Sequence, residues 1–138
     1  MAEREILFRG KRTYNGKWVE GSLVVTSQCN AYIISTVEDK RKATVLVNQC
    51  SLNVDPETVG QYTGLTDKNG RKIFEGDIVR YGDTIHKVVF EQRNDTAYFG
   101  LVYSEVETMP FGHYQDLTQI EVIGNIHDNP EILKNSSP

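Results

Sequence analysis

The feature that most constrains the fold is a series of short β-type runs separated by glycine-centred turns, which is densest in residues 60–83. Here the runs 61–66 and 71–74 flank Asp67-Lys68-Asn69-Gly70, which predicts a four-residue type I turn with Gly70 in the left-handed position. Glu75-Gly76-Asp77 predicts a second sharp corner, because glycine permits the turn and aspartate accepts N–H bonds within it.

The same alternation of runs and turns continues on both sides of this segment. Strands rich in β-branched and aromatic residues are predicted at 6–9, 18–26, 31–35, 43–47, 78–81, 85–90, 97–102 and 120–126. Asn15-Gly16 predicts a two-residue hairpin turn between the first two strands, and 38–42 reads as a solvated loop. No amphipathic helix of useful length occurs, and single helical turns are expected after Asp55, at 115–117 and at 130–133.

The expected architecture is all-β, with an N-terminal β-hairpin or sheet lobe over 1–53 and a small barrel lobe over 54–138. A chain of 138 residues fits one domain or two small lobes. Runs that are apolar on both faces, such as Lys87-Val88-Val89-Phe90, suit a strongly coiled barrel. Residues 75–80 resemble the opening strand of SH3-like barrels, so the second lobe is expected to be one.

Charge and cysteine usage limit the compartment and the partners. The formal net charge is −4, which argues against general affinity for nucleic acid or acidic membranes. Residues 1–42 nevertheless carry eight Lys or Arg against five acids, and residues 43–138 carry seven against fourteen. Without a signal peptide or an apolar span, and with Cys29 and Cys50 as two reduced thiols, a cytosolic protein with no membrane association is expected.

The glycines and histidines match no ligand or catalytic motif. Gly64 and Gly70 lack the spacing and the Lys-Ser/Thr pair of a phosphate loop, and an EF-hand alignment on Gly70 loses its first and last ligands. His86, His113 and His127 are far apart and are interpreted as partly exposed strand and loop histidines. We therefore expect a non-enzyme with no cofactor and no metal, while an enzyme with an unmarked carboxylate or histidine site stays open.

One basic and aromatic cluster stands out as a candidate binding surface. It surrounds the first predicted hairpin and consists of Arg9, Lys11, Arg12, Tyr14, Lys17 and Trp18. These residues could attract phosphates and stack a base, which would make the chain a nucleic-acid-binding protein. The alternative, which we favour because the chain is acidic overall, is an edge hairpin kept soluble by its charges.

Three ordered stretches together resemble the YopX family of phage and prophage proteins. They are 6–12 with 15–21, which includes Asn15-Gly16-Lys17-Trp18; 54–70 continuing through 73–79, which includes Tyr62-Thr63-Gly64-Leu65-Thr66-Asp67 and Glu75-Gly76-Asp77; and 120–126 before 129–131, which includes Gly124-Asn125-Ile126. The resemblance implies an all-β protein with an SH3-like barrel in its C-terminal part, encoded by a phage or prophage and acting in the bacterial cytoplasm. It supplies no activity, catalytic residue or cofactor.

The function expected from these observations is that of a non-enzymatic module that binds a host or phage protein through barrel loops or a strand edge. Self-association is a second expectation, because short strands leave edges that another copy could cover. Nucleic-acid binding through residues 9–18 is the alternative from a different class.

Overall fold

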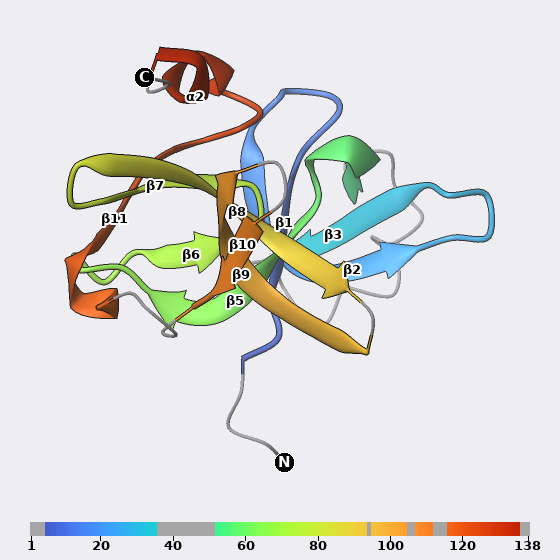
Figure 1. Cartoon of the computed structure of the whole chain (residues 1–138). Coiled ribbons are helices and arrows are strands. Elements are labelled where there is room, and N and C mark those ends of the chain that lie inside the picture. The colour runs from blue at the N-terminus through green and yellow to red at the C-terminus, as the bar shows by residue number, and fades with distance from the viewer. Residues whose placement is uncertain (1–4, 36–51, 94, 105–106, 112–115, 136–138) are drawn as a thin grey trace. The chain divides into compact units, whose positions relative to one another are not determined.

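The computed structural model consists mainly of β-strands (Figure 1). It describes residues 5–35, 52–93, 95–104, 107–111 and 116–135. The chain divides into two compact units, Met1–Tyr62 and Thr63–Pro138. Within the described residues the strands form two antiparallel sheets. The six-stranded sheet has the order β4 (Asn53–Val54), β3 (Ala31–Ser35), β2 (Trp18–Val25), β1 (Phe8–Lys11), β5 (Gly60–Thr66) and β6 (Lys72–Phe74). The five-stranded sheet has the order β10 (Glu107–Pro110), β9 (Thr96–Ser104), β8 (Thr84–Arg93), β7 (Asp77–Tyr81) and β11 (Ile120–Asn125). The prediction of an all-β fold is therefore confirmed.

The first unit is a ring of short antiparallel strands. Its elements are β1 (Phe8–Lys11), β2 (Trp18–Val25), β3 (Ala31–Ser35), β4 (Asn53–Val54), the 3-10 turn η3 (Pro56–Thr58) and the start of β5 (Gly60–Thr66). β1 pairs with β2 and with the first residues of β5, while β4 pairs with β3. A bridge between Arg12 and Val54 brings β4 back to the end of β1, and this closes the ring.

Small and branched residues fill the inside of this ring. Ala31, Ile33 and Val54 are buried together, and Val19 from β2 packs against them. Gly10 on β1 lies so close to this core that an added Cβ would sit 3.2 Å from atoms of both Ile33 and Val54. The glycine therefore lets β1 approach the core more closely than a larger residue would.

The connection between β1 and β2 is longer than predicted. The N–H of Arg12 donates to the carbonyl of Lys17 (2.9 Å), and the N–H of Gly16 donates to the carbonyl of Arg12 (2.8 Å). Gly16 has φ 70°, while Asn15 does not have a positive φ. A two-residue turn of the predicted kind needs two successive residues with positive φ, so the prediction was wrong and the loop spans residues 13–16.

The second unit is a half-barrel with one helix near its end. Its elements are β6 (Lys72–Phe74), β7 (Asp77–Tyr81), β8 (Thr84–Arg93), β9 (Thr96–Ser104), β10 (Glu107–Pro110), η4 (Leu117–Gln119), β11 (Ile120–Asn125) and α2 (Pro130–Asn135). Ile73 of β6 is fully buried with Val79, Val88, Leu101 and Ile120 from the five-stranded sheet. The short hairpin of β5 and β6 thus contributes to the core that lies on one face of that sheet.

Asp67 joins this hairpin to β11. One carboxylate oxygen accepts the N–H groups of Asn69 (2.8 Å) and Arg71 (2.9 Å), and the other accepts the N–H of Val122 (2.9 Å). The N–H of Lys68 also donates to the carbonyl of Ile120 (2.8 Å). The turn at 67–70, with Gly70 at φ 81°, is therefore confirmed, and it also covers the outer edge of β11.

The corner at Gly76 and Asp77 is confirmed as well. Gly76 has φ 93°, and the buried carboxylate of Asp77 accepts the N–H of Phe74 (2.7 Å). The N–H of Gly76 donates to the carbonyl of Val88, and its carbonyl accepts the N–H of Ile126, each at 2.9 Å. The corner therefore ties the start of β7 to β8 and to the residue that follows β11.

Most predicted strands occur, with shifted ends. The strand at 31–35 matches β3, and β8 and β9 extend beyond the predicted 85–90 and 97–102 to residues 93 and 104. The short strands β4 and β10 were not predicted. The helical turn after Asp55 is present, and Asp55 accepts the N–H of Glu57 (3.0 Å). The predicted strand at 43–47 and loop at 38–42 lie outside the described residues.

Candidate functional site

The strand register brings three of the six predicted binding residues together. Lys11 pairs with Trp18 and Arg9 pairs with Glu20, so these four side chains alternate with the inward-facing residues of β1 and β2. The Arg9 guanidinium carbon lies 4.8 Å from the centroid of a Trp18 ring, and the Lys11 ammonium nitrogen lies 5.5 Å from it. Both distances are in the range of cation–π attraction.

This contact changes what the cluster can do. Arg9 is only 8% exposed, and its guanidinium packs on the ring that a base would otherwise stack against. Because the contact between cation and ring is already made within the chain, it stabilises the β1–β2 pair whether or not a ligand is bound. Stacking of a base on the same ring face would require the arginine to move.

Arg12 lies inside the first unit. Its side chain is 5% exposed, and one guanidinium nitrogen donates to the backbone carbonyls of Ile33 (2.8 Å) and Leu52 (2.7 Å). An always-charged guanidinium that donates to two carbonyls ties the end of β1 to β3 and to the residue before β4. The sequence predicted that Arg12 would contact phosphate, but its charged guanidinium instead bonds to backbone carbonyls and holds strands together.

The residues of the cluster that face solvent are in the loop. Tyr14 is 67% exposed and Lys17 is exposed, while Lys11 and Trp18 are half-buried. A phosphate ligand would therefore meet Lys17 and Lys11 first, with Tyr14 as the available aromatic ring. This is a smaller positive surface than the six residues in the sequence indicated.

A second surface, which the sequence did not reveal, lies on β8, β9 and the residue after β10. Phe90 pairs with Phe99, and the N–H of Phe111 donates to the carbonyl of Phe99 (3.2 Å), so three phenylalanines lie side by side on adjacent strands. The Phe90 and Phe99 rings meet edge to face, with centroids 5.0 Å apart. We call Phe90, Phe99 and Phe111 the phenylalanine row.

The phenylalanine row continues the hydrophobic core to the surface. Val88 and Leu101, two residues before Phe90 and two after Phe99, form the adjacent cross-strand pair and are fully buried. Side chains two residues apart on a strand point to the same face, so the row lies on the core face of the sheet. Phe90 is nevertheless 42% exposed, and its neighbour Phe99 is half-buried.

His86 precedes Val88 by two residues and Tyr103 follows Leu101 by two, so these two side chains flank the Val88–Leu101 pair on the side away from the phenylalanine row. His86 is 5% exposed, so the prediction of a partly exposed histidine was wrong here. Its Nδ1 lies 3.0 Å from the carbonyl oxygen of Val102, its Nε2 lies 2.7 Å from the Thr84 hydroxyl, and its ring stacks on Tyr103 with centroids 4.3 Å apart. Both ring nitrogens are thus engaged by neighbouring groups, which gives His86 a structural role.

Two further features bear on function. Among the residues that the structure describes, there is no group of three or more His, Cys, Asp or Glu side chains placed to hold a metal ion. The same described residues include no helix that is long and apolar enough to cross a membrane.

Comparison with known proteins gives a family and a fold. A family model described as "YopX protein" matches residues 7–134. No curated protein matches the sequence. Protein EF1440 from Enterococcus faecalis has a similar crystal structure, with a TM-score of 0.56 and 23% sequence identity over 95% of this chain and 99% of that one. At this identity the likeness shows the fold alone.

Proposed function

The chain belongs to the YopX protein family, and on this premise we propose that it is a non-enzymatic protein-binding module of a phage or prophage. The family model covers nearly the whole chain, so the resemblance found in the sequence is confirmed. The phage setting and a site of action in the bacterial cytoplasm are the parts of this proposal that the resemblance implies.

The observation that carries the proposal is the exposed phenylalanine row. Phe90 is 42% exposed although it lies on the same sheet face as Val88, which is fully buried. Large aromatic side chains at the surface of a folded sheet are typical of the centre of protein–protein contacts, where they supply most of the binding energy. The polar side chains His86 and Asp67, by contrast, are already satisfied by backbone groups and a hydroxyl.

A capture experiment tests this function. The tagged full-length chain, its Phe90→Ser variant and its Tyr14→Ser variant are incubated with lysate of a bacterial host that is expressing the phage or prophage genes, with and without nuclease. We expect a protein that the wild type and Tyr14→Ser retain after nuclease treatment and that Phe90→Ser loses. Tyr14→Ser is the matched control, because it also removes an exposed aromatic ring, here from the β1–β2 loop. If no protein survives nuclease treatment, the proposed function is refuted.

Nucleic-acid binding remains the second candidate, supported by the exposed Tyr14 and Lys17 in the β1–β2 loop. This function predicts weak, salt-sensitive binding of single-stranded DNA or RNA. Replacing Lys11 and Lys17 with Glu would then abolish binding in a fluorescence anisotropy titration at low salt. Unchanged affinity of that variant would exclude this surface as the binding site.

A further inference from the structure

We propose that the phenylalanine row receives an apolar anchor side chain from a basic segment of the partner protein. This inference rests on the proposed function, because it assigns the surface and the partner chemistry of the same binding module.

Among the residues that the structure describes, the strand positions beyond the row leave its rings uncovered on the side of the β8–β9 turn. Beyond Phe90 and Phe99 the next cross-strand pair is Gln92 and Ala97, and both of these residues are exposed. The alanine is too small to shield the rings, and the glutamine is polar. The edge-to-face arrangement of Phe90 and Phe99 keeps the two rings in fixed contact, so an incoming side chain meets a surface that is already ordered.

The size of this surface favours a single anchor over a second copy of the chain. A phenylalanine that is 42% exposed presents on the order of 100 Å², given the area that an aromatic side chain can bury. A stable dimer needs ~800 Å² from each copy. The row therefore matches one or two apolar side chains of a short segment.

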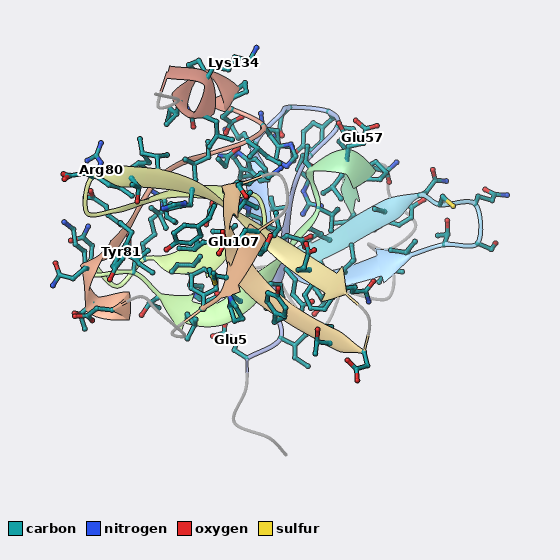
Figure 2. All side chains as sticks on the ribbon, in the orientation of Figure 1. Glu5, Glu57, Arg80, Tyr81, Glu107 and Lys134 are labelled. Carbon is teal, nitrogen blue, oxygen red and sulfur yellow. The ribbon has the colours of Figure 1, made fainter. Side chains whose placement is uncertain are left out.

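The acidic charge of the second unit indicates which kind of partner segment would bind the row. Residues 63–138 carry twelve acids against seven Lys or Arg. Asp95 is exposed in the β8–β9 turn beside the row, and Glu107 is exposed at the start of β10, four residues before Phe111 (Figure 2 labels Glu107). Lysines or arginines beside the anchor would be attracted by these carboxylates, whereas nucleic acid would be repelled.

The neighbouring strand edge is less suited to a partner than the face. β10 ends in Pro110, which has no N–H to donate, and its register shifts between Glu107 and Thr108. Both features blunt a sheet edge against strand addition. The partner segment is therefore expected to contact the rings of the row instead of extending the sheet.

Selection from a library of random short peptides on the full-length chain tests the inference. We expect the enriched peptides to pair an apolar residue with neighbouring Lys or Arg, and to bind Phe90→Ser at least ~10-fold more weakly than wild type. Binding should also weaken with Glu107→Lys, which alters an exposed charge and leaves the rings in place. Tyr14→Ser should bind as wild type does, and circular dichroism checks that every variant is folded.

Four results would overturn the inference: acidic enriched peptides, equal binding to Phe90→Ser, no enrichment, or a concentration-dependent dimer of the wild type that Phe90→Ser loses. The last result would make a second copy the occupant. If a host protein is captured equally by wild type and Phe90→Ser, the proposed function stands and only the assignment of the row fails. If peptides bind the row but neither a host protein nor a phage protein is captured, the proposed function fails and the row remains a peptide site.

Discussion

Replacing Asp67 with asparagine is expected to remove a large part of the stability of the second unit. The new side chain would keep one carbonyl-type oxygen for the N–H groups of Asn69 and Arg71, but its amide NH₂ would then face the buried N–H of Val122. A buried donor left without its acceptor costs ~1–3 kcal/mol, and the lost bond had a charged acceptor. We expect a loss of ~2–3 kcal/mol, which lowers Tm by roughly 6–12 °C for a chain of this size.

The effect should also depend on pH. Burial alone would raise the pKa of Asp67, but the N–H groups of Val122, Arg71 and Asn69, together with the charge of Arg71, outweigh burial and hold this pKa below its usual value. A carboxyl group whose pKa is lowered by folding stabilises the protein above its unfolded pKa, and this contribution is lost as the pH falls through the folded pKa. The gap in stability between wild type and Asp67→Asn should therefore narrow as the pH is lowered below about 4.

Thermal unfolding followed by far-UV circular dichroism measures the stability, and hydrogen exchange at the Val122 amide measures the local bond. Asp83→Asn is the control, because it makes the same change of charge at an exposed turn residue. If Asp67→Asn unfolds with the same midpoint as Asp83→Asn, or if the Val122 amide stays equally protected, the carboxylate does not hold β11 and the reasoning is wrong.

Two further predictions concern the first unit. Arg12→Lys should destabilise it by ~1–3 kcal/mol, because an ammonium on a flexible stem cannot reproduce the donation of one guanidinium to two backbone carbonyls. Urea unfolding followed by Trp18 fluorescence checks this, and the midpoint of the variant should lie at a lower urea concentration than that of the wild type. Gly21→Ala should cost more than ~3 kcal/mol, because the new Cβ would overlap the carbonyl group of Ile34 on β3. Gly16→Ala is the control, because a Cβ added at Gly16 meets no atom within 4 Å, and only the positive φ of this residue should cost stability, ~1 kcal/mol. Equal losses of stability in the two glycine variants would contradict this explanation.

The parts of the fold that could be predicted from the sequence are those set by local chemistry. Asp67 and Gly70 define their turn through bonds and a backbone angle within five residues, and Asp77 and Gly76 do the same at the next corner. The prediction of a two-residue turn at Asn15-Gly16 was wrong because an Asn-Gly pair suits either such a turn or the end of a longer loop. Which loop forms is decided by the pairing of the flanking strands.

The binding surfaces were harder to predict because they depend on distant partners. Arg12 is buried through carbonyls that lie 21 and 40 residues further along the chain, so no local pattern distinguishes it from the exposed Lys17. The phenylalanine row can be predicted only from the register of β8 and β9, in which Arg93 pairs with Thr96 and Phe90 therefore pairs with Phe99. The predicted strands ended at residue 90 and began at residue 97, so this pairing was not recognised.

The bond between Asp67 and Val122 also sets an order of events during synthesis. The two residues are 55 positions apart, and β11 is the last strand of the five-stranded sheet along the chain. The ring of the first unit, by contrast, has its closing bridge available once β4 at Asn53–Val54 has been translated. During synthesis on the ribosome the first unit can therefore fold early. The half-barrel cannot complete its core until residue 122 has left the exit tunnel, and until then the Asp67 carboxylate lacks the Val122 N–H that it accepts in the folded unit.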